Sequence, residues 1–402
     1  MVLRMIEICL SQGGGRMKRR HIAVLSLFLS FLISIGLQSV LASDECVPPG
    51  RFPYQQGWLG GDGAYSIPLS DGRTLWLFGD TFVSDNPNQT EGRILSAFVR
   101  STIGISACDP NFSILYYWRQ MYSSHPEPFF DVTDNHEDAW YWPTDGFEYH
   151  GKIYVTLTEH MIDPDGPPGL NFTVSGVVLA IIQHIREDPA HWIVEYKRLS
   201  DNPYASPGTT IAREGELLYF FSVLHNGTHD IMITRIPVSS IDDPEGSVEY
   251  LDKGGRWRKG FNQKDFDINT AKILFQEGST EMTVRYHGLL NKWLALYSKN
   301  FSEVYIRTAD QVLGPWSEER MIFKMPEFKT IEHSLCYAGK EHIQYSGEYQ
   351  EDLVLTYACN FLMPDSIPEG QRNAELEKSF QNMDMYVPTT VILSLYDLFN
   401  FK

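Results

Sequence analysis

The stretch GGDGAYSIPLSDGRTLWLFGD, residues 60–80, decides how the rest of the chain is interpreted. Two apolar runs flank Asp71-Gly72, which is a strong hairpin signal because glycine accepts the positive φ that a tight turn requires. The stretch therefore predicts a β-hairpin with an aspartate at each foot, the end away from the turn. Asp62 lies on the first strand and Asp80 on the second.

The same phrase recurs along the chain: an acid or threonine, a short apolar strand, a turn with glycine or asparagine, and a strongly apolar, aromatic strand. Its five copies are residues 60–80, 142–160, 207–222, 278–298 and 337–360. Further strands are expected between the copies, at residues 94–105, 176–185, 231–236, 304–308 and 387–395. Helical periodicity is scarce, and residues 373–381 are the best short candidate.

This repetition predicts an all-β fold, a five-bladed β-propeller with four-stranded antiparallel blades around a central channel. A β-sandwich of similar size would also have many short strands, but it would not repeat one hairpin phrase five times. In a propeller the first strand of each blade lines the channel. The residue that opens each copy should therefore point toward one mouth of the channel: Asp62, Asp145, Thr209, Glu281 and Glu341.

Four of these five residues are acids. Like charges around one channel cost energy, because each raises the pKa of the others. A purely structural ring would favour neutral residues. The crowding therefore indicates a site that handles cations, protons or sugars.

Asp62 and Asp80 are the candidate catalytic pair. A two-residue hairpin loop would pair Gly63 with Asp80 and leave Asp62 diagonal, whereas a three-residue loop with a bulge would pair the two aspartates directly. Either register brings two carboxylates to one end of a blade, as glycoside hydrolysis requires. The alternatives are turn chemistry and a Ca²⁺ site, and Ca²⁺ is the one cofactor that this sequence suggests.

Other side chains near these acids are expected to contact substrate. Asp145 and Glu281 belong to the ring, and Trp58 and Trp142 precede ring acids as candidate stacking platforms. Arg285 is expected either to bond sugar hydroxyls or to neutralise a neighbouring acid. His342 follows the last ring position, where a structural hydrogen bond is the alternative to a substrate contact.

The N-terminus carries an export pattern. Met17-Lys18-Arg19-Arg20 precedes an apolar run that ends in Val40-Leu41-Ala42, a cleavage site of the A-x-A kind. We expect residues 1–42 to be a signal peptide with Met17 as its start, and residues 43–402 to be a single propeller domain. An uncleaved anchor is the alternative, since the run approaches the roughly 20 residues that span a bilayer. The body is expected to be secreted, or periplasmic in a bacterium.

The net charge of −18 disfavours nucleic acid, anionic membranes and polyanionic substrates. We expect a neutral polysaccharide or oligosaccharide as the partner, no stable membrane insertion after cleavage, and a monomer. The sequence lacks an HExxH motif, a phosphate-binding loop, a CxxC pair and a GxSxG elbow.

Four cysteines follow the signal peptide, an even number that suggests disulfides in an exported chain. Cys336 and Cys359 flank a turn at residues 346–349 symmetrically, so a hairpin there would place them opposite each other. By elimination Cys46 would bond Cys108. Five N-x-S/T triplets would be glycan sites in a eukaryotic secretory pathway: Asn88, Asn111, Asn171, Asn226 and Asn300.

The phrases GGDGAYSIPLSDGRTLWLFGDTF, WPTDGFEY, GSTEMTVRY and VYIRTADQVLGPWS resemble a family of secreted five-bladed propellers known as a domain of unknown function, which includes microbial endo-D-arabinanases. It is similar in architecture to the arabinanase and β-fructosidase furanosidases. The resemblance covers nearly all of residues 50–400. Residues 361–385 form a polar segment that departs from it and could border the cleft.

The resemblance implies a glycoside hydrolase that acts on furanose-containing, arabinan-like polysaccharide without a required cofactor. It implies that Asp62 and Asp80 are the catalytic pair, with Asp145 and Glu281 among the active-site acids. The competing hypothesis is a propeller that binds a glycan or a protein without catalysis, its acids holding Ca²⁺ or structural hydrogen bonds.

Overall fold

The computed structural model describes residues 46–108, 111–132, 138–166, 171–262, 266–363 and 366–400. Val47–Lys402 form one compact unit. The predicted signal peptide, residues 1–42, lies outside the described residues. Within the ranges given above, no helix has the length and apolar character needed to cross a membrane.

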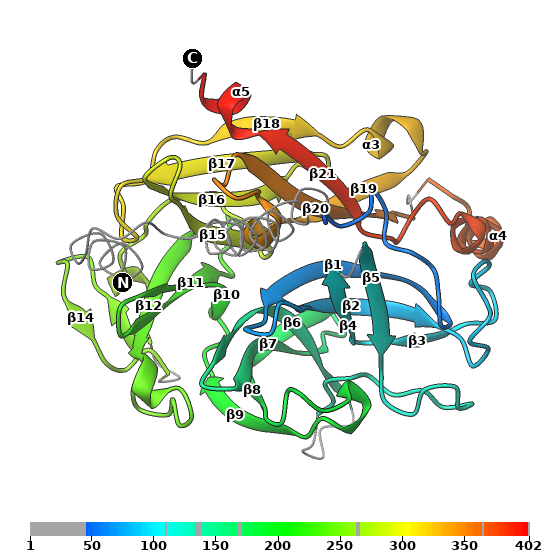
Figure 1. The fold of residues 1–402 in the computed structure, drawn as a ribbon, viewed down its shortest axis with the longest axis horizontal. Coiled ribbons are helices and arrows are strands. Elements are labelled where there is room, and N and C mark those ends of the chain that lie inside the picture. Colours follow the sequence, from blue (N-terminus) through cyan, green and yellow to red (C-terminus); the bar gives the residue numbers. More distant parts are fainter. Residues whose placement is uncertain are drawn as a thin grey trace, which may run out of the picture. The chain divides into compact units, whose positions relative to one another are not determined.

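Five antiparallel sheets follow one another in chain order, from the blue and teal first sheet to the orange and red fifth (Figure 1). The first sheet contains β1 (Trp58–Pro68), β2 (Thr74–Val83), β3 (Ala97–Val99), β4 (Thr102–Cys108) and β5 (Phe112–Tyr117). The second contains β6 (Ala139–Tyr149), β7 (Lys152–Ile162), β8 (Phe172–Ile182) and β9 (Val194–Ser200). The third contains β10 (Ala205–Glu214), β11 (Leu217–Leu224), β12 (Ile231–Pro237), β13 (Glu249–Leu251) and β14 (Trp257–Arg258).

The last two sheets contain four and three strands. The fourth contains β15 (Met282–His287), β16 (Lys292–Lys299), β17 (Glu303–Ala309) and β18 (Arg320–Lys324). The fifth contains β19 (Ser334–Glu341), β20 (Asp352–Phe361) and β21 (Thr389–Ser394). Short 3₁₀ turns are η1 (Pro189–His191), η2 (Val238–Ser240), η3 (Ile268–Thr270) and η4 (Ile343–Tyr345).

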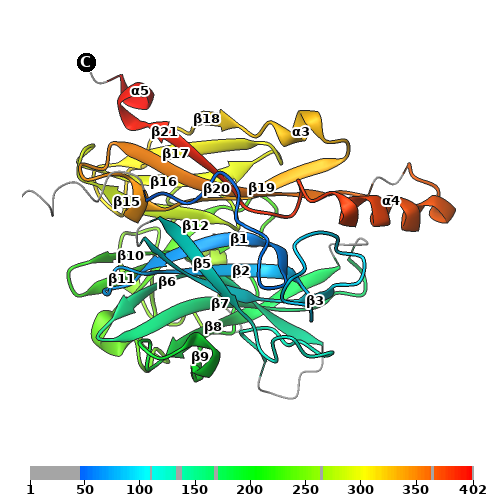
Figure 2. The ribbon, with the colours of Figure 1, turned by 45° about the vertical axis from the view of Figure 1, so that its right-hand side comes forward.

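Helices are few in the part of the chain that the structure describes, as expected. They are α3 (Glu327–Thr330), α4 (Glu369–Gln381) and α5 (Leu395–Phe399). Helix α4 contains the predicted residues 373–381, begins earlier, and extends away from the sheets (Figure 2). The strand expected over residues 94–105 is divided into β3 and β4, with Arg100 between them.

The five hairpin phrases form the first two strands of the five sheets, which confirms the predicted repeat. The first strands also contact one another in a closed ring: β1 with β6, β6 with β10, β10 with β15, β15 with β19, and β19 with β1. The fold is therefore the predicted all-β, five-bladed propeller. Each neighbouring pair of sheets buries an apolar layer, and burial of this kind supplies most of the folding free energy.

The ring of sheets is closed by the N-terminal segment of the unit. The fifth sheet has three strands of its own. Beside β21, the Thr390 amide donates to the Gly50 carbonyl at 2.9 Å, and the Phe52 amide donates to the Pro388 carbonyl at 3.2 Å. The buried Phe52 ring then packs against Trp76 of the first sheet. Residues 50–52 thus join the last blade to the first.

The predicted disulfide between Cys336 and Cys359 is confirmed, and the two residues lie opposite each other on β19 and β20. Cys46 and Cys108 are disulfide-bonded as well. The pairing of these two with each other stays a prediction.

Glu341, the last expected ring acid, lies in a buried ion pair instead of at the mouth. Its Oε1 is 2.7 Å from His287 Nε2, and both side chains are 0% exposed. The pair joins the ends of β15 and β19, so it links the fourth blade to the fifth. Burial by itself lowers the pKa of His287, but the facing Glu341 carboxylate outweighs burial and raises that pKa above its ordinary value.

This pair predicts a pH-dependent stability. A raised histidine pKa contributes stability that is complete below the ordinary value of about 6.5 and is lost as the pH rises through the folded value. His287→Gln should cost roughly 3–5 kcal/mol at acidic pH, because it leaves a buried carboxylate unpaired. The difference from wild type should shrink as the pH rises above neutrality. Urea unfolding of both proteins across this range measures it.

His342→Gln is the matched control, because His342 is equally buried but its pKa is lowered by burial to about 3. Its cost should be constant above neutrality and should shrink as the pH falls below about 6.5, because a lowered histidine pKa destabilises the wild type there. The two variants should therefore have opposite pH trends, and a cost for His287→Gln that also shrinks toward acidic pH would contradict the ion pair.

Candidate active site

The pairing near the turn of the first hairpin fits a three-residue loop, and the register shifts at three points, of which the two between Gly61 and Tyr65 cancel. Pro68 pairs with Thr74 near the turn, Gly63 pairs with Phe78, and Gly61 pairs with Thr81 near the foot. Asp62 therefore lies opposite Gly79 and Asp80, close to the register predicted for a three-residue loop with a bulge. Bulges re-aim side chains, and they commonly do so beside active sites.

Two glycines make room for this arrangement. A Cβ on Gly79 would lie 2.4 Å from Asp62 Oδ1, and a Cβ on Gly60 would lie 2.2 Å from the Tyr386 carbonyl oxygen. Gly60 also has a φ of 114°, which favours glycine. The glycines noted in the sequence thus let the Asp62 carboxyl lie over the neighbouring strand.

Asp80 is held by two donors and remains 14% exposed. Trp142 Nε1 donates to its Oδ1 at 2.9 Å, and Arg100 lies 3.2 Å from its Oδ2. Burial raises the pKa of Asp80 to about 6, while Arg100 and Trp142 oppose that rise. Both donors stabilise a charged carboxylate, so Asp80 is ionised at neutral pH.

Asp62 has the opposite environment. It accepts a hydrogen bond from the Tyr337 hydroxyl at 3.1 Å. Burial, followed by the negative charges of Asp80 and Glu281, raises the pKa of Asp62 well above its ordinary value. The two aspartates of one hairpin therefore differ in environment, and burial beside two other acids favours the protonated form of Asp62.

Glu281 is the third acid of this cluster. Burial raises its pKa, against the opposing effects of Thr280 and Lys340. Three tyrosines surround the acids, and burial together with nearby carboxylates raises the pKa of each: Tyr65, Tyr337 and Tyr386. The site is thus a partly exposed group of three carboxyls in an aromatic setting.

Asp145 belongs to the same ring but is fully bonded. It accepts hydrogen bonds from the Thr210 hydroxyl and the Ile211 amide, both at 2.8 Å, and pairs with Arg285 at 3.1 Å. Burial alone would raise the pKa of Asp145, but Arg285 and Lys340 outweigh burial and lower it. Of the two roles expected for Arg285, the structure shows neutralisation of a neighbouring acid, Asp145.

Two predicted substrate contacts are wrong as they stand. Trp58 is fully buried and stacks on Tyr116 with ring centroids 4.2 Å apart, so it has no surface for a sugar ring. His342 is also buried, and its two ring nitrogens bond the hydroxyls of Ser66 and Thr356. The structural alternative noted for His342 is the correct one. Trp142, in contrast, is half-buried beside Asp80.

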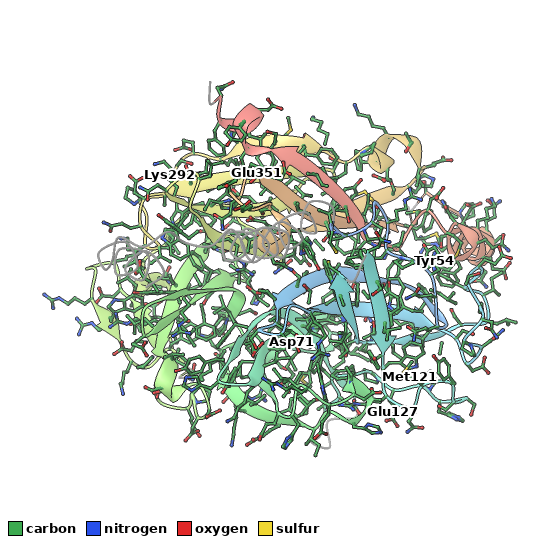
Figure 3. All side chains as sticks on the ribbon, in the orientation of Figure 1. Tyr54, Asp71, Met121, Glu127, Lys292 and Glu351 are labelled. Carbon is green, nitrogen blue, oxygen red and sulfur yellow. A yellow bond between two sulfur atoms is a disulfide. The ribbon has the colours of Figure 1, made fainter. Side chains whose placement is uncertain are left out.

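The end of the unusual segment 361–385 reaches the site. The buried Arg93 donates to the carbonyls of Leu59 at 2.6 Å, Asn382 at 3.0 Å and Met385 at 2.8 Å. It also donates to the hydroxyl of Tyr54, which Figure 3 labels. These hydrogen bonds from Arg93 hold Tyr386 near the carboxyl pair. No pattern in the sequence predicts this contact.

Two other features lie elsewhere. A cavity of about 410 Å³ is lined by Ser70, Asp71, Glu148 and Arg186 among others, at the turn end of the first hairpin (Asp71 is labelled in Figure 3). Among the described residues, one cluster of three metal-ligand types has its ligand atoms within 4.8 Å of one another, Glu327 with Cys336 and Cys359. Those cysteines are bonded to each other, and Asp62 and Asp80 are not in the cluster.

Residues 51–394 match the family model described as Domain of unknown function (DUF5005). The chain belongs to this family. The match confirms the resemblance inferred from the hairpin phrases. No curated protein matches the chain.

Several solved structures resemble the chain to different degrees. A Bacteroides ovatus ATCC 8483 protein named "putative hydrolase" is 19% identical with a TM-score of 0.61, over 85% of this chain and 88% of that one. A Bacillus subtilis arabinoxylan arabinofuranohydrolase of glycoside hydrolase family 43 is 10% identical with a TM-score of 0.46, over 84% of this chain and 64% of that one. The catalytic domain of the Coprinopsis cinerea GH62 α-L-arabinofuranosidase is 11% identical with a TM-score of 0.38, over 87% and 98%. The Bacteroides protein shows the shared propeller fold.

The role of Arg100 can be tested directly. Arg100→Met removes the cation beside Asp80, so the pKa of Asp80 should rise above 6 by about one unit, since a nearby opposite charge favours the ionised form. Carboxyl ¹³C NMR titration of protein labelled at aspartate measures this change.

Arg198→Met is the matched control, because Arg198 is exposed to the same extent as Arg100 and pairs with Glu159 and Asp201. It should leave the titration of Asp80 unchanged. Equal titrations in wild type and Arg100→Met would mean that Arg100 does not set the charge of Asp80.

Proposed function

We propose that this protein is a secreted glycoside hydrolase that acts on a neutral, furanosidic, arabinan-like polysaccharide. The observation that carries the proposal is the contrast between the two aspartates of the first hairpin. Asp80 faces a guanidinium and an indole N–H, whereas Asp62 faces a tyrosine hydroxyl and further acids. One ionised and one protonated carboxyl are the groups that glycoside hydrolysis uses.

In this mechanism Asp62 gives its proton to the glycosidic oxygen as the bond to the anomeric carbon breaks. Asp80, as the ionised partner, either attacks the anomeric carbon or takes a proton from the water that attacks it. Tyr337 orients Asp62 through its hydroxyl, and Trp142 orients Asp80 through its indole N–H. Glu281 helps Asp62 keep its proton, because a nearby negative charge raises the pKa of Asp62.

A polymeric substrate is supported by exposed apolar side chains on the segment that leads to Arg100, which we call the rim: Ile94, Leu95 and Phe98. These side chains are 49%, 95% and 47% exposed. The Arg100 guanidinium lies 5.7 Å from the Phe98 ring and 4.3 Å from the Trp140 ring, and the same guanidinium pairs with Asp80. Exposed apolar groups that continue into a polar site are typical of ligand surfaces.

Secretion is supported by the oxidised cysteines and by the export pattern at residues 17–42. The furanosidic character of the substrate rests on the resemblance of the hairpin phrases to arabinanase-like propellers.

The proposal predicts that Asp80→Asn lowers turnover on arabinan by about 10²–10⁴-fold, because an amide can act neither as a base nor as an anionic nucleophile. Asp62→Asn should lose activity similarly, since it cannot donate a proton. Reducing-end release from a panel of arabinans measures both variants. Asp71→Asn, at the turn end of the same hairpin, is the matched control and should keep wild-type turnover.

Wild-type protein that binds these glycans without hydrolysing them would favour the competing function, a glycan-binding propeller. Unchanged turnover in Asp80→Asn would remove Asp80 from the mechanism.

The rim makes a separate prediction. The double variant Leu95→Ser with Phe98→Ser should raise KM for arabinan several-fold, because it removes apolar contact area for sugar rings distant from the scissile bond. Its kcat/KM on a short aryl furanoside should stay within two-fold of wild type, an order-of-magnitude bound for a surface change away from the reacting atoms. Ile193→Ser is the control, since Ile193 is also strongly exposed but lies on the β8–β9 connection. Equal effects on both substrates would contradict a polymer-binding rim.

A further inference from the structure

A single buried ammonium group lies where the five first strands meet. Lys340 is on β19, and its side chain is 1% exposed. Its Nζ donates to the carbonyl oxygens of Thr144 at 2.8 Å, Thr209 at 3.1 Å and Met282 at 2.7 Å. These residues belong to β6, β10 and β15. Nζ also lies 4.2 Å from the centre of the Tyr65 ring, on β1.

This geometry satisfies the ammonium completely. A lysine ammonium has three N–H donors, and here each has its own carbonyl acceptor from a different blade. The aromatic face of Tyr65 supplies a further attraction for a cation. An unpaired charge this deeply buried would be very costly. The three carbonyl oxygens and the Tyr65 ring are the partners that a buried cation needs, so together they form a cation-binding site.

The carbonyls are also placed beside the ring acids. Thr144 directly precedes Asp145, Met282 directly follows Glu281, and Tyr65 lies on the same strand as Asp62. Burial lowers the pKa of Lys340 to about 8, against the opposing effect of Asp145, with Arg285 and Glu281 also acting on it. The ammonium is thus the positive charge that the ring of acids surrounds.

We propose that the propeller axis is a cation-binding site made of three backbone carbonyl oxygens and the Tyr65 ring, selective for a cation that donates N–H bonds, and that this chain fills it with its own Lys340. The site fixes the spacing of the five first strands. It goes beyond the proposed hydrolysis, because its existence does not depend on any substrate.

The test removes the lysine and offers small cations in its place. Lys340→Ala leaves the carbonyls and a space that ammonium or methylammonium can enter. Its Tm should fall by roughly 5 °C, the size expected when a bonded buried charge is lost from a unit of this length. Methylammonium chloride should restore part of the lost Tm in a saturable way, because a ligand that binds only the folded state stabilises it. Tetramethylammonium chloride at equal ionic strength should not, since it has no N–H donors.

Two further variants sharpen the comparison. Lys340→Met loses the charge but fills the space, so its lowered Tm should not respond to methylammonium. Lys299→Ala is the matched control, because Lys299 is a partly buried lysine that pairs with Glu277 and Glu319 away from the axis. It should show no difference between the two salts.

Equal responses of Lys340→Ala to the two salts, or an unchanged Tm, would overturn the proposal. Where Lys340→Ala does not fold by itself, refolding from urea in each salt gives the same comparison, and equal refolding yields would overturn it. Recovery of arabinan turnover by methylammonium is a second readout that rests on the proposed function. If the wild-type protein has no turnover, the proposed function is wrong, but the Tm comparison still tests the cation-binding site.

Discussion

The candidate active site depends on how the propeller offsets the electrostatic cost of holding several acids together at its axis. Burying several carboxyls together is unfavourable, because each raises the pKa of the others and none has full access to water. Here two cations inside the ring limit that cost. Arg285 pairs with Asp145, and Lys340 bonds the backbone beside Asp145 and Glu281. Of the two aspartates of the first hairpin, Asp80 pairs with Arg100, whereas Asp62 bonds the neutral Tyr337 hydroxyl, so their proton affinities separate.

Within the first hairpin, the two carboxyls lie in different electrostatic environments. The strands that carry Asp62 and Asp80 are neighbours, so the difference comes from the side chains that surround each carboxyl. The second blade contributes Trp142 to Asp80, and the break between β3 and β4 contributes Arg100. The fifth blade contributes Tyr337 to Asp62. One hairpin can therefore supply both a protonated and an ionised carboxyl, because the groups around Asp62 differ from those around Asp80.

The sequence predicts the local features well, since hairpins depend on neighbouring residues. The five copies, the three-residue loop alternative and the Cys336–Cys359 pair all follow from short-range patterns. What it misses depends on strand facing or on distant segments. A shift of one residue separates Lys340, which occupies the axis, from Glu341, which was expected there. Trp58 and Trp142 have similar sequence settings, but one faces the core and the other faces Asp80.

The segment 361–385 shows the same limit at longer range. Its last residues reach the site through Arg93, a residue of the first blade that lies nearly 300 positions earlier and bonds the Asn382 and Met385 carbonyls. No local pattern encodes that contact. Its consequence is that Tyr386 and the Asp62 strand are fixed to each other across the junction where residues 50–52 close the ring. The site is therefore built at the place where the first and last blades meet, so closure of the propeller and assembly of the carboxyl pair are one structural event.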